Sequence, residues 1–345
     1  MNGIDNFLEK INIEDISDIH ITSGLAPMVR KDGKLINALG NDKLDFNSVD
    51  CFIREMAPNR YDDFLLKGEI DFKYISENIG NFRVNAYKCM NSLGIVMRVI
   101  KNKIPRLDDI SSLTILKEFT ELKDGLVLVT GPTGSGKSTT LAAMINEINK
   151  TQEKHIITLE DPIEYIFKTN KCMINQREIG EDTLSYANGL RAALRQDPDI
   201  IFLGEMRDPE TIEIALRAAQ TGHLVFSTLH NMGAVESIYR IVNSFDASNQ
   251  NEIKIQLSSL LRGVISQVLL PNASGKGRSA AMEVMVCTPG IKNLIREGNF
   301  EQINSYIQMG AKHGMNTIDM DLRRLVNDGI ISRKEYDKWI KNSNF

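Results

Sequence analysis

A glycine-rich run in the middle of the chain has the residue types and spacing of a phosphate-binding loop. Residues 131–139 read GPTGSGKST and fit the pattern GxxxxGK[ST]. Glycines let the backbone curl so that its N–H groups point at phosphate oxygens. Lys137 would reach the β- and γ-phosphates of a nucleotide, and the Ser138 hydroxyl would bind Mg²⁺. The residues expected to bind the nucleotide are Gly131, Thr133, Gly134, Ser135, Gly136, Lys137, Ser138 and Thr139.

The segments on either side have the order that such a loop needs. Residues 126–129 (LVLV) are typical of a buried parallel strand, and residues 138–148 carry apolar side chains at helical spacing. The amino end of that helix would add its partial positive charge next to the phosphates. A glycine-rich turn with only a structural role is the alternative, and it fits this order less well. The sequence therefore predicts a site for ATP or GTP together with Mg²⁺.

Two carboxylates at the ends of expected strands could activate water. Glu205 follows the apolar run 200–203, and Glu160 follows the run 156–159 and begins an acidic cluster. A phosphate-binding loop needs such an acid to organise water and Mg²⁺ before it can hydrolyse a nucleotide, and Glu205 could also contact the metal through water. For Glu205, the alternative is an acid at a strand end that a helix amino terminus holds in place. For Glu160, it is one of several loop acids exposed to solvent. Which of the two is the general base stays open.

His230 lies at the carboxyl end of a third apolar run, residues 224–229, where a histidine can sense a γ-phosphate. The alternative is that His230 makes an ordinary hydrogen bond and has no further role.

Four arginines could spread transition-state charge, in some enzymes from a neighbouring subunit. Arg191 and Arg195 are four residues apart in an expected helix over 183–196 and would share one face. Arg83 and Arg98 lie on expected strands nearer the N-terminus. A solvated basic surface is the alternative for the first pair.

Length and composition narrow the class of protein. The 345 residues are enough for two domains with a core each, and 42% hydrophobic and 25% charged residues are ordinary for a globular protein. The net charge of −4 gives no strong field that would favour nucleic acid or an anionic membrane. No apolar run approaches the roughly 18 residues that span a bilayer, and the N-terminus has no secretion signal. The cysteines form no CxxC pair, and the expected location is the cytoplasm.

The first 100 residues predict a small α+β domain, because short alternating runs are separated by glycines, as in an antiparallel sheet with one solvated face. Helical patterns cover 47–56 and 61–67. The expected strands include residues 19–22, 28–30, 70–74, 82–87 and 96–100.

Residues 101–110 predict a hinge linker, since they begin polar and contain a proline. Residues 111–345 then predict a P-loop α/β domain, with a helical region from about residue 288. In the expected helix over 183–196 the apolar face comprises Leu184, Ala187, Leu190 and Leu194. Residues 272–279 predict a mobile loop.

Four blocks, in this order, resemble those of the secretion ATPases of type II secretion and type IV pili. They are GPTGSGKST (131–139), TLEDPIEY (158–165), LRQDPDIIFLGEMRD (194–208) and TGHLVFSTLH (221–230). The N-terminal stretches 17–35 and 82–87 also resemble that family's first domain. The resemblance implies a RecA-like ATPase domain preceded by a smaller domain with a PAS-like antiparallel sheet.

Within this family the tail is similar to that of the retraction motors of twitching motility. Residues 290–297 (GIKNLIRE) resemble the AIRNLIRE signature of those motors, with Gly290 in place of Ala and Lys292 in place of Arg. Ile291, Leu294 and Ile295 would face inward on this helix. A solvated amphipathic helix without a special role is the alternative. The retraction motif so defined comprises Ile291, Lys292, Asn293, Leu294, Ile295, Arg296 and Glu297.

The resemblance also implies a mechanism. The chain would form a homohexameric ring with ATP between subunits, and Lys137, Ser138, Glu205, Glu160 and His230 would keep the roles given above. Arg83, Arg98, Arg191 and Arg195 match arginines that contact or sense phosphate in the family. Rotation of the first domain about the linker would turn hydrolysis into torque. The implied partners are the inner-membrane platform protein and the pilus machinery, reached from the cytoplasmic face without insertion into the membrane.

Three other functions are compatible with a P-loop. The chain could extend a pilus or drive type II secretion, a reading against which the tail motif argues. It could move nucleic acid, which the acidic composition disfavours. It could also be a scaffold that binds nucleotide without hydrolysing it, but the presence of Glu160 and Glu205 argues against this function.

Overall fold

The computed structural model describes residues 3–11, 13, 16–31, 33–76, 78–100 and 103–342. The chain divides into two compact units, residues 1–103 with 164–166, and residues 104–163 with 167–345. Within the linker expected at 101–110, Lys101 and Asn102 lie outside the described residues, and Leu107–Ile110 forms the short helix α4. In the described parts no helix is long and apolar enough to cross a bilayer.

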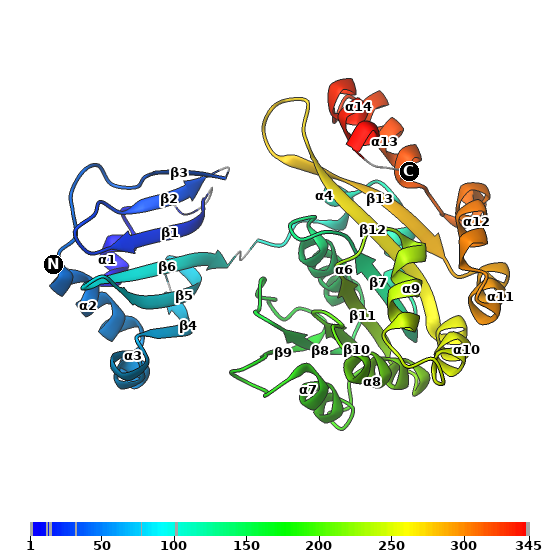
Figure 1. The fold of residues 1–345 in the computed structure, drawn as a ribbon, viewed down its shortest axis with the longest axis horizontal. Helices are drawn as coiled ribbons and strands as arrows, with labels where there is room; N and C mark the ends of the chain where they lie inside the picture. Colours follow the sequence, from blue (N-terminus) through cyan, green and yellow to red (C-terminus); the bar gives the residue numbers. More distant parts are fainter. Residues whose placement is uncertain are drawn as a thin grey trace. The chain divides into compact units, whose positions relative to one another are not determined.

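The first unit is a six-stranded antiparallel sheet in the order β3-β2-β1-β6-β5-β4, with its helices packed on one face (Figure 1). The alternating runs of the sequence are confirmed as strands. The strands are β1 (Ile16–Thr22), β2 (Met28–Lys31), β3 (Lys34–Asn37), β4 (Glu69–Ser76), β5 (Gly80–Cys89) and β6 (Ser92–Ile100). The helices are α1 (Ile4–Leu8), α2 (Phe46–Met56) and α3 (Tyr61–Lys67), with a 3₁₀ turn at Pro58–Arg60.

The ends of these helices follow from local chemistry. Asp45 caps α2 by accepting a hydrogen bond from the Ser48 N–H (2.8 Å), and Gly68 ends α3 in the left-handed conformation (φ 83°). The buried faces of helices and sheet share one core that includes Phe64, Phe82 and Ile95. Strand β3 was not predicted, because all four of its residues are exposed and show no alternation.

The second unit contains a seven-stranded sheet in the order β13-β12-β7-β11-β10-β8-β9. All neighbours are parallel except β12 and β13, which form an antiparallel hairpin. This mixed α/β architecture confirms the predicted fold class. The strands are β7 (Gly125–Thr130), β8 (His155–Glu160), β9 (Met173–Glu178), β10 (Ile200–Leu203), β11 (Leu224–Leu229), β12 (Leu261–Pro271) and β13 (Arg278–Val286). Its first helices are α5 (Ile115–Thr120), α6 (Lys137–Thr151), α7 (Tyr186–Ala193), α8 (Pro209–Gln220), α9 (Ala234–Asn243) and α10 (Gln250–Leu260).

Helix α7 is shorter than predicted, and this corrects two expectations. Ser185 caps it by accepting the Asn188 N–H (3.2 Å), so Leu184 lies outside the helix and is 86% exposed instead of packing on its apolar face. The helix ends at Ala193, so Arg195 lies beyond it and does not share a helical face with Arg191.

The tail is helical as predicted and packs along the hairpin (Figure 1). The segment expected to be a mobile loop is the turn of this hairpin. Residues 278 and 279 belong to β13, and the Asn272 N–H donates to the Gly277 carbonyl (3.2 Å). The tail comprises α11 (Pro289–Glu297), α12 (Ile303–Met309), α13 (Ile318–Asn327) and α14 (Arg333–Asn342), with 3₁₀ turns at Phe300–Gln302 and Ala311–His313.

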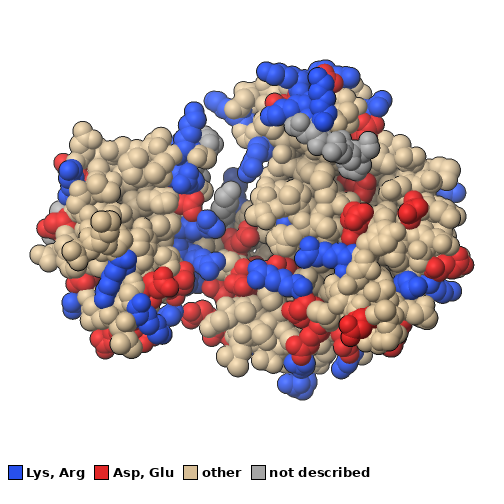
Figure 2. Space-filling view, in the orientation of Figure 1, with Lys and Arg blue, Asp and Glu red and all other residues tan. Residues whose placement is uncertain are grey.

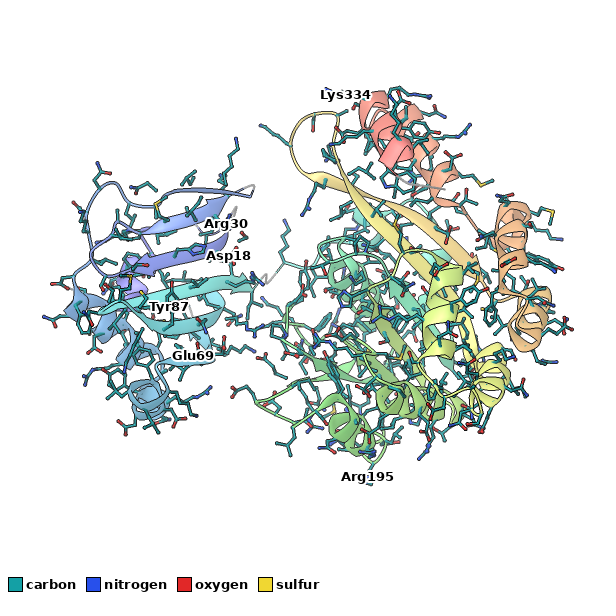
Figure 3. All side chains as sticks on the ribbon, in the orientation of Figure 1. Asp18, Arg30, Glu69, Tyr87, Arg195 and Lys334 are labelled. Carbon is teal, nitrogen blue, oxygen red and sulfur yellow. The ribbon has the colours of Figure 1, made fainter. Side chains whose placement is uncertain are left out.

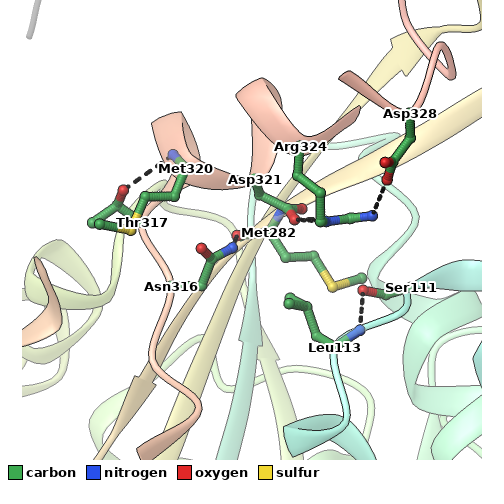
Figure 4. A network of polar contacts seen from close by, with 9 residues as sticks. All are labelled: Ser111, Leu113, Met282, Asn316, Thr317, Met320, Asp321, Arg324 and Asp328. Atoms are coloured by element: carbon green, nitrogen blue, oxygen red, sulfur yellow. Dashed lines mark hydrogen bonds and ion pairs between the residues drawn. The ribbon is translucent and has the colours of Figure 1, made fainter. Parts of the chain in front are cut away.

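A buried carboxylate joins α13 to β13 (Figure 4). Asp321 is fully buried and accepts the Met282 N–H (2.8 Å) and Nε of Arg324 (2.9 Å). Arg324 also pairs with Asp328, and the Asn316 amide donates to the Met282 carbonyl (3.1 Å). These contacts hold the carboxyl-terminal helices on the sheet through one polar network.

Candidate active site

The glycine-rich run forms the connection between β7 and α6, as its sequence predicts. Gly136 caps α6 with φ 88°, Gly134 has φ 79° and Gly131 has φ 144°, all in a region that side chains with a Cβ rarely adopt. At Gly131 a Cβ would also stand 2.3 Å from the Gln267 carbonyl oxygen. Glycine is therefore required where the loop leaves the sheet.

Lys137 is buried in this loop. Its Nζ donates to the carbonyl oxygens of Gly131 (2.8 Å) and Pro132 (3.1 Å). An ammonium held inside the curve of the loop can exchange such donations for phosphate oxygens. The Ser135 hydroxyl is also buried here, and within the described residues it has no hydrogen-bond partner. A nucleotide phosphate is an acceptor that would fit both groups.

Glu205 and His230 meet at the carboxyl edge of the sheet. They follow the neighbouring parallel strands β10 and β11, and Nε2 of His230 lies 3.0 Å from Oε2 of Glu205. Arg207 pairs with the other oxygen of the carboxylate (2.5 Å), although the Glu205 residue is only 7% exposed. The sequence placed each residue at a strand end but did not indicate the pairing, and it did not single out Arg207.

Glu160 ends the next strand along, β8, and is buried as well. Its carboxylate accepts hydrogen bonds from the Thr158 hydroxyl (2.7 Å) and the Gln176 amide (3.3 Å). Both predicted acids therefore lie at the ends of adjacent strands, each with its own polar contacts.

Tyr186 was not predicted to belong to the site. A Cβ built on Gly204 would stand 2.9 Å from the Tyr186 hydroxyl, so this hydroxyl packs against the residue that precedes Glu205. Burial raises the pKa of Tyr186, and the nearby carboxylates, Glu205 first, raise it further. The side chain thus stays protonated and able to donate. A tyrosine at the start of a helix carries no sequence signal for this role.

In the described parts of the chain, no group of three or more His, Cys, Asp and Glu side chains is arranged to hold a metal ion.

The arginines occupy different places. Arg191 pairs with Glu210 of α8, and Arg195 is exposed just beyond the carboxyl end of α7 (Figure 3).

Arg83 and Arg98 face each other across β5 and β6 in the first unit. The register continues this row on one sheet face from Arg30 through Asp18 to Arg98 and Arg83 (Figure 3 labels Asp18 and Arg30). Asp18 accepts Nε of Arg98 (3.0 Å). Burial works against ionisation of this carboxyl, but the Ser17 hydroxyl and Arg98 hold its pKa below the ordinary value. The row therefore contains an ionised acid among arginines.

The tail motif lies on α11 with the orientation that its spacing predicts. Ile291, Leu294 and Ile295 are buried, while Asn293, Arg296 and Glu297 are exposed and Lys292 is half-buried.

A Cβ on Gly290 would stand 2.6 Å from Cε1 of Tyr306 in α12. The tyrosine ring therefore occupies the space that an alanine methyl group would need.

Comparison with known proteins agrees with this arrangement. The family model described as "Type II/IV secretion system protein" matches residues 4–338. The chain is 45% identical to the type IV pilus retraction ATPase PilT of Pseudomonas aeruginosa over 322 residues, which cover 92% of each chain. It is 48% identical to a twitching motility protein of Neisseria gonorrhoeae over 275 residues, 80% of this chain and 74% of the relative.

Solved structures of related ATPases also match this chain along nearly its whole length. A crystal structure of the pilus retraction motor PilT with bound ADP superimposes with a TM-score of 0.90 at 42% identity, covering 98% of this chain and 97% of that one. The ATPase DotB of Legionella pneumophila superimposes with a TM-score of 0.82 at 30% identity, covering 98% and 93%. With its P-loop, its two strand-end acids and these matches along nearly its whole length, the chain belongs to the type II/IV secretion system protein family.

Proposed function

We propose that this protein is an ATP-hydrolysing motor that powers type IV pilus retraction, and thereby twitching motility. The observation that carries the proposal is the combination of an intact P-loop with Glu205 and His230 paired at the adjoining strand ends, in a chain 45% identical over 92% of its length to a retraction ATPase.

The P-loop residues 131–139 bind the nucleotide phosphates in this proposal. Lys137, which donates to the loop carbonyls, would donate to the β- and γ-phosphates instead, and the Ser138 hydroxyl would hold Mg²⁺, which would neutralise phosphate charge. A bound Mg²⁺ ion usually keeps several of its water ligands. Carboxylates next to it would therefore accept hydrogen bonds from these waters, and this fits Glu205 and Glu160 at the ends of their strands.

One of these two acids activates the attacking water. His230 contacts Glu205 directly, so it can report the state of the γ-phosphate to that acid. The Glu160 carboxylate accepts hydrogen bonds from Thr158 and Gln176. These contacts suit a group that orients water next to Glu205.

The other parts of the motor are proposed from the family resemblance. Six chains form a ring, and the hinge within 101–110 lets the two units rotate. Arg83, Arg98, Arg191 and Arg195 stabilise phosphate charge, with Arg83 and Arg98 acting on the nucleotide of a neighbouring subunit. The ring works at the cytoplasmic face of the inner membrane, on the platform protein of the pilus.

Retraction is favoured over extension because residues 290–297 resemble the tail signature of retraction motors and the chain is 45% identical to a retraction ATPase. In α11, Ile291 and Ile295 are buried and Arg296 is exposed. A nucleic-acid motor is not favoured, because the net charge is −4 and acidic side chains are interspersed with basic ones over the visible face of the second unit (Figure 2).

Phosphate release by the purified protein tests the enzymatic part. We expect ATP turnover that requires Mg²⁺, stops on chelation with EDTA and is lost in Lys137→Ala. Lys150→Ala, an exposed lysine at the far end of the same helix, is the matched control and should turn over ATP normally. Full activity of the Lys137→Ala protein would contradict the proposal.

A further inference from the structure

A buried glutamine of strand β12, which is distant from the P-loop in sequence but lies next to β7 in the sheet, holds the P-loop in place. Gln267 is 1% exposed, and its side-chain amide makes two hydrogen bonds across more than 120 residues of sequence. Its Nε2 donates to the Ser135 carbonyl oxygen (2.6 Å), and its Oε1 accepts from the Thr140 hydroxyl (2.8 Å). One bond holds the tip of the loop, and the other holds the first turn of α6.

The backbone register explains why this strand can reach the loop. Strands β12 and β7 are paired up to Ser266 and Thr130, so Gln267 and Gly131 are the next residues on the two strands. The loop curls directly against the glutamine, since a Cβ on Gly136 would stand 3.1 Å from Nε2. Two of the loop glycines thus leave room for Gln267.

The two bonds need an amide. The Ser135 carbonyl oxygen can only accept a hydrogen bond, and the Thr140 hydroxyl donates one here. The side chain at position 267 must therefore donate at one atom and accept at another, as an amide does. A carboxylate would place oxygen against the Ser135 oxygen, and an apolar side chain would leave both partners unsatisfied in a buried place.

The preceding residue of β12 serves the other side of the site. Ser266 accepts the Gly233 N–H (2.8 Å), and its cross-strand partner Glu283 accepts the Ala234 N–H (2.8 Å). Both N–H groups belong to the segment that follows His230. Consecutive residues of one strand therefore fix the P-loop and the chain that follows the histidine.

We propose that Gln267 is a positioning residue of the nucleotide site, which holds the P-loop N–H groups in the arrangement that binds phosphate. The proposal rests on the proposed function, because it requires that residues 131–139 bind the nucleotide. Gln267 itself does not contact the nucleotide; it acts through Ser135 and Thr140.

The test compares nucleotide affinity and turnover in matched variants of the full chain. Gln267→Met keeps the length of the side chain and removes both hydrogen bonds, and Gln267→Glu reverses the polarity at Ser135. Gln152→Met is the control, since Gln152 also donates to a backbone carbonyl, that of Thr120 (2.7 Å), from the opposite end of α6. We expect at least a tenfold rise in the dissociation constant for ADP and in KM for ATP in both Gln267 variants, and no change in Gln152→Met.

Thr140 gives an independent test from the other end of the bond. Thr140→Ser keeps the hydroxyl and should keep affinity, whereas Thr140→Val, of nearly equal volume, should weaken it. Thr140→Val should add little to Gln267→Met, because both remove the same bond. A purely structural role would lower the melting temperature of these variants and leave KM unchanged.

Lys137→Ala separates the two possible failures. If Lys137→Ala abolishes binding while Gln267→Met and Thr140→Val bind ADP like the unaltered protein, the positioning role is wrong and the nucleotide site stands. If Lys137→Ala binds ADP normally, the proposed site is wrong, and the role of Gln267 falls with it.

Discussion

The imidazole of His230 lies against the carboxylate of Glu205, with Nε2 3.0 Å from Oε2, although 25 residues separate them in sequence. The contact exists because β10 and β11 are neighbouring parallel strands whose carboxyl ends meet at one edge of the sheet. In the mechanism that we propose, His230 would sense the γ-phosphate and Glu205 would act on water. This one hydrogen bond would then link the state of the nucleotide to its hydrolysis.

Replacing Glu205 should affect turnover more than binding. We expect Glu205→Gln to lower kcat by about 100-fold or more, the range for loss of a general base or water-orienting acid, with little change in KM. His230→Ala should lower kcat by roughly tenfold, through loss of a hydrogen bond to a charged group. Steady-state phosphate release measures both.

His223 is the control for this pair. It lies at the other end of β11, where its Nδ1 contacts Thr221 and the Ala218 carbonyl, away from the acids. His223→Ala should keep normal turnover, and a loss equal to that of His230→Ala would argue against a specific role for His230.

Arg296 should separate motor output from ATP hydrolysis. It is exposed on α11, and among the described residues its side chain makes no hydrogen bond or ion pair, so Arg296→Ala should leave kcat and the melting temperature unchanged while twitching is lost. Lys312→Ala, an exposed cation in the 3₁₀ turn after α12, is the control and should twitch normally. Normal motility of Arg296→Ala cells would remove α11 from the retraction mechanism.

Gly290 and Tyr306 should show a coupled effect on stability. Gly290→Ala alone should destabilise by about 1 kcal/mol, because the new methyl group meets the tyrosine ring. In a Tyr306→Ala background the same change should stabilise by about 0.5 kcal/mol, since alanine is the better helix former. Thermal melting of the four proteins measures this change of sign, and equal effects in both backgrounds would show that the ring does not exclude alanine.

Asp321 should make stability depend on pH. Burial raises its pKa above the ordinary 3.8, against the opposing hydrogen bonds from Arg324 and Met282. A raised folded pKa means that the fold favours the protonated acid, so the contribution of Asp321 to stability falls as pH rises from 3.8 through the folded pKa.

Substitutions distinguish the charge of Asp321 from its hydrogen bond. Asp321→Asn keeps an acceptor for the Met282 N–H and should be neutral or slightly stabilising at pH 7, with a flatter pH dependence. Asp321→Ala leaves that N–H without its partner in a buried place and should cost about 1–3 kcal/mol. Urea unfolding at several pH values checks both, and equal destabilisation by the two variants would contradict the raised pKa.

The sequence predicted those parts of the fold that depend on local patterns. The apolar runs at β7, β8, β10 and β11 are buried on both faces, and their continuous hydrophobicity is the signal for such strands. The P-loop followed from the pattern GxxxxGK[ST] between an expected strand and an expected helix, because its backbone needs glycine at fixed positions. Both candidate acids were found since each comes directly after such a strand.

The parts that were missed depend on contacts distant in sequence. Strand β12 starts immediately after α10, with no glycine or proline between them to mark the change, and it was not predicted. The contacts of Gln267 could consequently not be predicted. Nor could those of Tyr186, whose hydroxyl lies next to Gly204 only when α7 packs on the sheet. Arg195 was misplaced because periodicity gives no precise helix end.

The central claim is best tested by counting surface pili and measuring twitching in cells that carry Lys137→Ala in place of the native protein. A retraction motor without ATP turnover leaves extension unopposed, so we predict excess surface pili together with lost motility. Cells without pili would instead show that this ATPase extends them, and would contradict the account of α11 and of retraction.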